Sequence, residues 1–448
     1  MARKLFGTDG VRGIAGELLT AELALALGSA ATRDASAASS PKGERERPQV
    51  LIIRDTRESG EMLEAALAAG VSAAGGDALL GGVLPTPAAP LLMRRYGFDL
   101  AAVLSASHNP YQDNGIKFFA GDGYKLSDES ELAIERALEA SAISSPASAI
   151  GHIRDLRGAP EDYLRELHVR FRELDLDGLD VVLDCANGAT YQVAPEIFRR
   201  LGARVTVLAD TPDGRNINAE CGSTHMQTLA QTVLAGGHAL GFAFDGDGDR
   251  VLAVDRSGAV VDGDELMALA TLHLRARGRL SGDGVAVTVM TNYGFHAAME
   301  REGVAVATTQ VGDRYVLEEL RARGWTLGGE QSGHIIDMSF NRTGDGIASA
   351  LLTLEALRGS DLSERHAMSK LPQRLVNVRV RDREGLAKAR DLSAEVSAAE
   401  RELSGRGRVL VRASGTEPLV RVMVEAPTDE EAELVCSRLV AQVERELG

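Results

Sequence analysis

Short apolar runs alternate along this chain with longer segments in which apolar residues recur every three or four positions. The first helical pattern begins at Thr20 and places Leu23 and Leu27 on one face. The apolar runs that predict buried strands in the first third of the chain lie at residues 50–53, 83–87, 101–104 and 114–119. Because strands that alternate with helices usually form a mostly parallel sheet covered by helices, this third of the chain predicts an α/β domain.

The alternation resumes after residues 141–160, a stretch rich in Ser, Ala, Gly and Pro that predicts a domain boundary. Further strands are predicted at residues 179–184, 204–208, 241–244, 285–291 and 304–309, and further helices at 191–200, 316–323 and 346–357. From about Leu371 the order becomes strand, helix, strand, strand, helix. The last helix opens with Thr428 and Glu431 at capping-box spacing. Residues 31–48, dominated by Ala, Ser and charge, predict a flexible, solvated insertion.

These shifts of pattern predict three related α/β domains with mixed sheets and a smaller C-terminal α+β domain. The predicted domains span residues 1–157, 158–256, 257–368 and 369–448. A length of 448 residues fits this division, since domains average roughly 150 residues. The content of 44% hydrophobic and 25% charged residues is that of a soluble globular protein.

Charge and cysteine content limit the classes of partner and compartment. The formal net charge of −16 argues against nucleic acid or an anionic membrane as the main partner, so an anionic ligand would need cationic groups gathered locally. Cys185, Cys221 and Cys436 are far apart and form no CxxC pair, which fits a reducing cytoplasm. The N-terminal residues lack the apolar core of a signal peptide, and no run approaches the ~18 apolar residues of a membrane span. We therefore expect a cytoplasmic protein.

The segment from 101 to 110, AAVLSASHNP, leads from an apolar strand into a small polar loop. That loop carries Ser105, Ser107 and His108. A strand that delivers a serine to an exposed turn, with histidine beside it, can present a nucleophile. Ser, Asn and Pro are also ordinary turn-forming residues, so the segment alone leaves a simple turn as the alternative.

A second apolar strand, 241–244, runs into three carboxylates that alternate with glycine. Asp245, Asp247 and Asp249 are too close together to stay ionised without a cation, and the glycines allow their oxygens to face one point. Hard carboxylate oxygens suit Mg²⁺. An EF-hand is excluded, because its sixth and twelfth positions are occupied here by Arg250 and Arg256. The alternative is a solvated acidic turn.

Three more polar loops carry groups that suit a phosphorylated sugar. Residues 328–334, GGEQSGH, place Glu330, Ser332 and His334 between glycines, where their side chains could bind hydroxyl groups. The other two loops are FGTDGVRG at 6–13, and RASGTEP at 412–418, whose guanidinium, hydroxyls and amides suit a phosphate monoester. Each loop could equally be a structural turn. The basic groups that would face a phosphosugar are Arg12, His108, Lys117, Arg250, Arg412 and Arg421.

Four of these motifs, SASHNP, DGDGDR, GEQSGH and RASGTEP, resemble those of the α-D-phosphohexomutases and occur in the same order. FGTDGVRG, NGIKFF and SGTEPLVRVMVE further resemble the bacterial amino-sugar branch of that family. The resemblance covers nearly the whole chain. It implies four domains around a central cleft, cytoplasmic localisation, and interconversion of glucosamine 6-phosphate and glucosamine 1-phosphate on the route to UDP-N-acetylglucosamine and the cell wall. A homodimer is a further family-level expectation.

The resemblance also implies a role for each motif. Ser107, the serine directly before His-Asn-Pro, would carry the phosphoryl group as phosphoserine and pass it to the sugar, with a hexose 1,6-bisphosphate as intermediate and activator. Mg²⁺ would bind Asp245, Asp247, Asp249 and the serine phosphate. The remaining residues implied are Glu330 and Ser332 for the sugar hydroxyls; Arg412, Ser414, Gly415, Thr416 and Arg421 for the other phosphate; and Arg12, His108, Lys117, Arg250 and His334 for charge stabilisation or proton transfer.

Three alternatives stay open at the level of sequence. A phosphomannomutase or phosphoglucomutase would use the same chemistry on another sugar. An aspartyl-phosphate phosphatase would use Asp245 as nucleophile and form a hydroxylamine-labile acyl phosphate. A phosphosugar-binding regulator would keep the cleft without turnover, although the serine and the three aspartates argue against that hypothesis.

Overall fold

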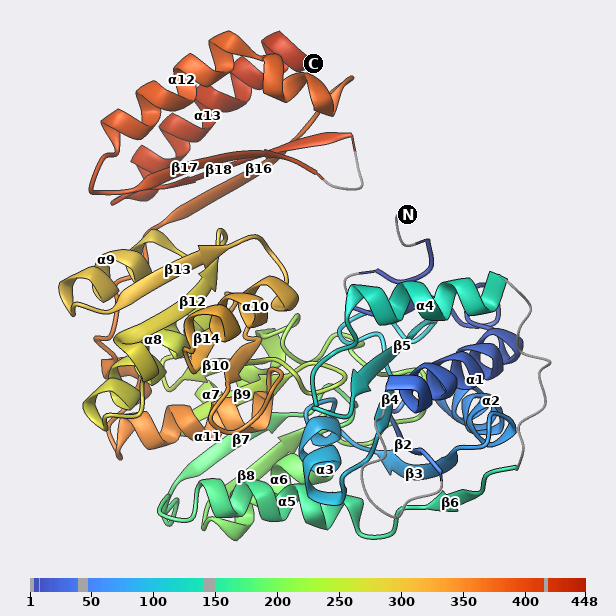
Figure 1. The fold of residues 1–448 in the computed structure, drawn as a ribbon. Coiled ribbons are helices and arrows are strands. Elements are labelled where there is room, and N and C mark those ends of the chain that lie inside the picture. The colour runs from blue at the N-terminus through green and yellow to red at the C-terminus, as the bar shows by residue number, and fades with distance from the viewer. Residues whose placement is uncertain (1–3, 8, 39–46, 140–149, 415–417) are drawn as a thin grey trace. The chain divides into compact units, whose positions relative to one another are not determined.

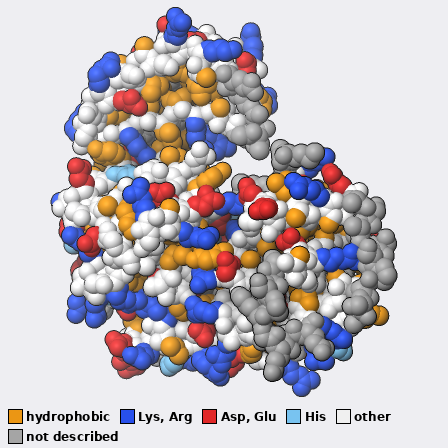
Figure 2. Space-filling model, in the orientation of Figure 1, with side chains coloured by type: hydrophobic (Ala, Val, Ile, Leu, Met, Phe, Trp, Pro, Cys, Tyr) orange, Lys and Arg blue, Asp and Glu red, His pale blue; other side chains and the backbone are white. Residues whose placement is uncertain are grey.

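The computed structural model describes residues 4–7, 9–38, 47–139, 150–414 and 418–448. It divides into a larger unit, Met1–Val289 with Ala307–Arg365, and a smaller unit, Met290–Val306 with His366–Gly448. Each unit is described by itself. No helix in the described part of the chain is long and apolar enough to cross a bilayer. Figure 2 shows basic and acidic side chains side by side on the drawn face of the larger unit.

The larger unit begins with a six-stranded sheet in the order β1-β5-β4-β2-β3-β6 (Figure 1). Its strands are β1 (Val11–Ile14), β2 (Gln49–Arg54), β3 (Asp77–Val83), β4 (Leu100–Leu104), β5 (Asp113–Ala120) and β6 (Ile153–Asp155). The central strands are parallel, as predicted: β2 runs parallel to β3 and β4, and β3 to β6. In contrast, β5 is antiparallel to both β4 and β1, so the sheet is mixed.

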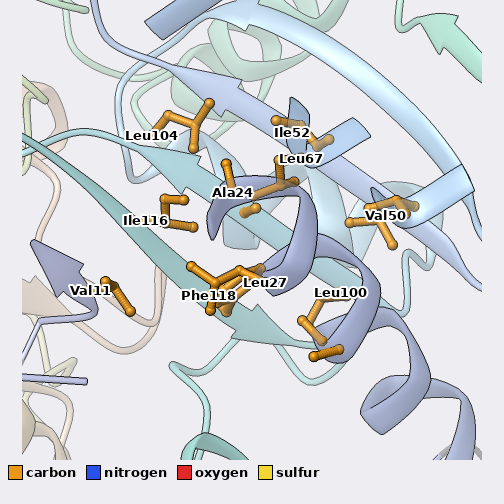
Figure 3. Close-up of a cluster of buried hydrophobic side chains, with 14 of the residues drawn as sticks. Val11, Ala24, Leu27, Val50, Ile52, Leu67, Leu100, Leu104, Ile116 and Phe118 are labelled. Carbon is orange, nitrogen blue, oxygen red and sulfur yellow. The ribbon is translucent and has the colours of Figure 1, made fainter. Parts of the chain in front are cut away.

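Four helices accompany this sheet in the described residues: α1 (Ala21–Ala38), α2 (Ser59–Ala73), α3 (Ala88–Tyr96) and α4 (Asp128–Glu139). Figure 3 shows the main core, in which Leu27 of α1 and Leu67 of α2 pack against Ile52, Ile116 and Phe118 of the strands. Burial of each such side chain contributes about 1.5–3 kcal/mol relative to leaving it exposed. This core fixes the strand ends that carry the polar loops described below.

The prediction of a solvated insertion at 31–48 is wrong for residues 31–38, which continue α1. Ala31 and Thr32 are buried there. The Ala-rich composition reflects close packing of α1 on α2: a side chain at Gly28 would meet the Leu67 carbonyl oxygen at 2.4 Å, and one at Gly70 would meet that of Leu25 at 2.0 Å. Residues 39–46 of the predicted insertion lie outside the described residues.

The second and third sheets of the larger unit are ordered β11-β10-β9-β7-β8 and β13-β12-β14-β15. Their strands are β7 (Asp180–Asp184), β8 (Arg204–Leu208), β9 (Leu240–Phe244), β10 (Val251–Asp255), β11 (Val260–Val261), β12 (Gly284–Thr288), β13 (Ala305–Thr309), β14 (Leu327–Gly329) and β15 (Ile335–Asp337). The accompanying helices are α5 (Ala159–Arg170), α6 (Val193–Arg200), α7 (Gln227–Gly236), α8 (Gly263–Ala276), α10 (Asp313–Arg323) and α11 (Gly346–Leu357). Both sheets mix parallel and antiparallel pairs, so the predicted mixed α/β class is confirmed.

The smaller unit contains α9 (Tyr293–Arg301) and an antiparallel sheet in the order β16-β18-β17. Its other elements are β16 (Gln373–Arg379), α12 (Arg390–Glu402), β17 (Arg408–Ala413), β18 (Leu419–Glu425) and α13 (Asp429–Leu447). The predicted order of strand, helix, strand, strand, helix is confirmed. Figure 1 shows α12 and α13 side by side on one face of the sheet. The predicted cap of α13 is also present, because the Thr428 hydroxyl accepts the Glu431 amide hydrogen at 3.2 Å.

Candidate active site

The turn that follows β4 holds Ser107 in the left-handed region of backbone space, with φ of 54°. We expected this serine in an exposed turn, but its exposed fraction is only 1%. Its hydroxyl donates to Asp245 Oδ2 at 2.6 Å and lies 3.3 Å from His108 Nδ1. Ser105 has a different structural role: its hydroxyl donates to Asp55 at 2.5 Å and accepts the Ser107 amide hydrogen at 3.0 Å. Ser107 is therefore the serine that faces the acidic loop.

The acidic loop between β9 and β10 brings three buried carboxylates together. Asp245, Asp247 and Asp249 each offer one oxygen, and these oxygens all lie within 4.8 Å of one another. Oδ1 of Asp247 and Oδ1 of Asp249 are buried and find no hydrogen-bond partner among the described residues. Burial, and then the charges of Asp249 and Asp247, raise the pKa of Asp245 well above its ordinary value. Hard, unsatisfied oxygens under mutual repulsion fit a divalent cation such as Mg²⁺.

Gly246 allows this loop to approach the serine turn. A Cβ atom at position 246 would lie 2.6 Å from the Ser107 carbonyl oxygen and 2.8 Å from Nδ2 of Asn218. Only a residue without a side chain fits that gap. The glycine spacing seen in the sequence therefore serves the contact between the acidic loop and the serine turn.

Lys117 extends from β5 into the acidic loop. Its Nζ donates to Asp247 Oδ2 at 2.8 Å and lies 3.0 Å from Asp9 Oδ2 and 4.0 Å from Asp249 Oδ2. Burial opposes a charged ammonium, but the carboxylates of Asp247 and Asp9 outweigh it and raise the pKa of Lys117. Thr86 donates to the same Asp247 oxygen at 2.6 Å. Lys117 is thus held as a cation next to the carboxylate cluster.

The loop between β14 and β15 also brings His334 to the cluster, 3.5 Å from Asp249 Oδ2 and 3.8 Å from Asp313 Oδ2. Burial disfavours its charged form, but those two carboxylates raise the pKa of His334 to about 9. Ser332 Oγ is buried, and within the described part of the chain it has no hydrogen-bond partner. A cavity of about 520 Å³, in the range of small-molecule sites, opens beside His334.

Two guanidinium groups supply the cationic side of the site, and His108 lies between Ser107 and one of them. Nη1 of Arg250 lies 3.3 Å from His108 Nδ1, and Arg12 forms an ion pair with Asp9. Burial, and then Arg250 and Arg12, lower the pKa of His108. Nε of both arginines is buried and has no hydrogen-bond partner in the described ranges. These groups place positive charge beside Ser107 in a protein that is acidic overall.

The smaller unit carries the remaining predicted residues. Arg412 of β17 and Arg421 of β18 lie directly opposite each other in the sheet. Burial and then the neighbouring Arg421 lower the pKa of Arg412, and Arg421 Nε is buried with no partner in the part that the structure describes. Like charges opposite each other destabilise a sheet, so the pair indicates an anion site. Ser414, two residues after Arg412, is buried, whereas Gly415 and Thr416 lie outside the described residues.

Sequence reasoning missed several residues that build the site. Lys125 Nζ lies 2.5 Å from both Asp9 Oδ1 and Asp313 Oδ2, which links segments far apart in the chain. Arg57 and Asn218 both bind the serine turn. For Arg57 a signal exists, since a polar run directly after the buried strand β2 must lie near the end of its parallel neighbour β4. No local pattern marks Asn218 or Asp313.

Comparison with family models covers almost all of the chain in four consecutive segments. The matches are phosphoglucomutase/phosphomannomutase α/β/α domain I at residues 3–143, domain II at 161–258, domain III at 262–375, and the C-terminal domain at 375–442. Together with the fold, they define a multidomain enzyme of hexose phosphate metabolism. The chain belongs to the phosphoglucomutase/phosphomannomutase family, the α-D-phosphohexomutases, which confirms the resemblance found in the sequence.

Individual curated proteins are similar to this chain over nearly its full length. The chain is 51% identical over 442 residues to phosphoglucosamine mutase of Moorella thermoacetica, covering 97% of this chain and 98% of the relative. It is 46% identical over 455 residues to the Bacillus subtilis protein of the same name, covering 99% of each.

Solved structures share the fold. A phosphoglucomutase/phosphomannomutase family protein from Burkholderia thailandensis aligns with a TM-score of 0.81 at 23% identity, covering 100% of this chain and 98% of that one. Aspergillus fumigatus N-acetylphosphoglucosamine mutase, solved with GlcNAc-6P and magnesium, aligns with a TM-score of 0.68 at 18% identity, covering 100% and 96%.

Proposed function

We propose that this protein is a phosphosugar isomerase that interconverts glucosamine 6-phosphate and glucosamine 1-phosphate. The observation that carries the proposal is the buried hydroxyl of Ser107, 2.6 Å from Asp245 in a cluster of three carboxylates. Over nearly its whole length, the chain is 51% identical in sequence to two proteins named phosphoglucosamine mutase. The product would feed the synthesis of UDP-N-acetylglucosamine and cell-wall precursors.

Ser107 is the proposed carrier of the transferred group, as phosphoserine. A free hydroxyl of the sugar monophosphate attacks the phosphorus, the bond to Ser107 Oγ breaks, and a hexose 1,6-bisphosphate forms. The bisphosphate then reorients in the site so that its other phosphate faces Ser107. Ser107 Oγ attacks that phosphate, and the isomeric monophosphate leaves. Such transfer depends mainly on positioning and on neutralising charge. Arg250, 3.3 Å from His108, and Arg12 are the proposed sources of that positive charge.

Asp245, Asp247 and Asp249 are the proposed ligands of Mg²⁺, with an oxygen of the serine phosphate. When bound, the ion supplies charge stabilisation to the transferring phosphoryl group. The unsatisfied Oδ1 atoms of Asp247 and Asp249 support this assignment. His108, Lys117 and His334 are the groups placed to move a proton or to stabilise charge around the reacting oxygens.

The remaining residues are proposed to bind the substrate. Glu330 and the unpaired hydroxyl of Ser332 suit the hydroxyl groups of the sugar. The phosphate that is not being transferred is proposed to bind Arg412, Ser414 and Arg421, with Gly415 and Thr416 proposed from the sequence motif alone. The opposed arginines of β17 and β18 support that part of the proposal.

The test is kcat/KM for glucosamine 1-phosphate against mannose 1-phosphate and glucose 1-phosphate, with Mg²⁺ and protein primed by a hexose 1,6-bisphosphate. We expect a clear preference for the amino sugar. Preference for mannose or glucose phosphate would move the protein to another branch of the family, and no turnover of any of the three would overturn the proposal. Phosphate bound to the primed protein should survive hydroxylamine, since an acyl phosphate on Asp245 would not.

We also propose a cytoplasmic location, which the three buried, unpaired cysteines support. A homodimer is proposed from the family alone, and sedimentation of the purified protein would test it.

A further inference from the structure

The Arg57 side chain is fully buried, and most of its hydrogen bonds go to the backbone of the serine turn. Its Nε donates to Asp55 Oδ2 at 2.8 Å. Its Nη2 donates to the carbonyl oxygens of Ser107 and Asn109, both at 2.9 Å. Its Nη1 donates to the carbonyl oxygens of Pro110 and, at 2.9 Å, of Asp113. The five N–H groups of the guanidinium thus meet one carboxylate and four carbonyl oxygens, a set that only the planar fork of arginine can satisfy.

Asn218 reaches the same turn from the polypeptide that precedes α7. Its Nδ2 donates to the Ser107 carbonyl oxygen at 2.9 Å and to that of Asn109 at 3.0 Å. The two carbonyl oxygens that Arg57 holds from the first sheet are therefore also held from the second. Asn218 itself has a φ of 59°, a conformation that asparagine adopts more readily than most residues.

The turn needs such support because Ser107 has a φ of 54°. A residue other than glycine in that region costs about 1–3 kcal/mol and persists only when its surroundings over-determine it. The amide of Ser107 is tied through Ser105 to Asp55, and Asp55 in turn binds Arg57. Both sides of the strained residue are therefore anchored by one connected network.

We propose that Arg57 and Asn218 are positioning residues that hold the serine turn in its left-handed conformation and so aim Ser107 Oγ at the acidic loop. The kinetic part of this inference rests on the proposed function, because it treats Ser107 as the group that carries phosphate. Neither residue touches the reacting atoms; both act through the backbone of Ser107. A displacement of about 1 Å in such a group can cost about 100-fold in rate.

Two substitutions remove the donors while sparing the rest of the fold. Arg57→Lys keeps the charge but places all its donors on one nitrogen, which cannot reach the five acceptors that the guanidinium binds. Asn218→Gly keeps the left-handed backbone and deletes both hydrogen bonds. The matched controls are Arg54→Lys and Asn216→Ala. The Arg54 guanidinium binds Glu64, Glu61 and, at 3.4 Å, the Asp55 carbonyl oxygen. Asn216 is half-buried, and its side-chain hydrogen bonds stay within residues 211–216.

Two readouts are measured on the full-length protein: steady-state kinetics after priming with a hexose 1,6-bisphosphate, and amide hydrogen exchange in the peptide that spans 104–114. We call Arg57→Lys and Asn218→Gly the clamp variants. We expect each clamp variant to lose about 10- to 100-fold in kcat, with KM changed less than threefold. Amide hydrogen exchange in the 104–114 peptide should rise at least tenfold. The double variant should lose less than the product of the two single losses, since both side chains share two acceptors. The control variants should match the wild type.

Wild-type kcat in both clamp variants, or unchanged exchange in 104–114, would overturn the inference. Ser107→Ala, measured in parallel, separates this failure from failure of the proposed function. If Ser107→Ala kept full turnover, the proposed function would fall together with the kinetic role of the clamp. Hydrogen exchange would then still decide whether Arg57 and Asn218 fix the turn.

Discussion

Replacement of Gly246 by alanine should separate the acidic loop from the serine turn. The added Cβ would lie 2.6 Å from the Ser107 carbonyl oxygen, whereas ordinary contact begins at about 3.4 Å, so the two loops must part by about 0.8 Å. The other near atoms, Nδ2 of Asn218 and Cδ1 of Ile217, lie at 2.8 and 2.9 Å and leave little room to relax. We expect overpacking to cost about 1–3 kcal/mol of stability, which leaves the protein folded.

The effect on catalysis should be much larger than the effect on binding. A shift approaching 1 Å between nucleophile and acidic loop predicts a fall in kcat of about 30- to 100-fold, or about 2–3 kcal/mol in the barrier. KM for glucosamine 1-phosphate should change less than threefold, because Glu330 and Ser332 lie on a different loop. The assay is steady-state kinetics with primed enzyme, together with calorimetric titration of Mg²⁺. Gly60→Ala is the control, since its Cβ would meet first, at 3.1 Å, the flexible side chain of Arg54. A Gly246→Ala protein with kcat within twofold of wild type would refute this reasoning.

Three further outcomes follow from the same structure. Asp247→Ala should remove both turnover and Mg²⁺ binding, and unchanged Mg²⁺ affinity by calorimetry would show that the cation site is misassigned. Lys117→Met leaves the buried carboxylate of Asp247 without its ammonium, so thermal unfolding in EDTA should reveal a loss of about 3–5 kcal/mol that Mg²⁺ partly restores; an unchanged melting temperature would contradict this prediction. Burial and then Arg408 lower the pKa of His296 to about 4, so the folded smaller unit binds fewer protons than the unfolded chain between pH 4 and 6.5. Its stability should therefore be full above about pH 6.5 and fall by up to about 3 kcal/mol as the pH drops through 4, a slope in pH-dependent unfolding that His296→Gln should flatten.

The order of strands and helices could be predicted from the sequence because buried strands are short apolar runs with clear ends. Composition misled at residues 31–38, since the same Ala and Ser content suits either a solvated loop or a helix that packs closely on another. Only tertiary contact with α2 decides between them.

The residues of the candidate site also divide into those that the sequence could predict and those that it could not. Asp245, Asp247 and Asp249 are neighbours in sequence, so their convergence could be predicted from spacing. The burial of Ser107 and the contacts of Asp313 and Asn218 arise from residues more than a hundred positions apart, and no local pattern encodes them. A serine between a strand and a proline looks the same whether the turn is open to solvent or enclosed.

The pairing of distant segments around the carboxylates has a consequence for how activity is gained during folding. Asp9, Lys125 and Asp313 meet only after separate stretches of chain have each formed and docked, and closure of such long loops is slow. Far-ultraviolet circular dichroism would therefore recover early during refolding, while turnover would return last. Catalytic rate would then serve as a stringent gauge of conformational completeness, able to distinguish a native preparation from one that merely contains its helices and strands.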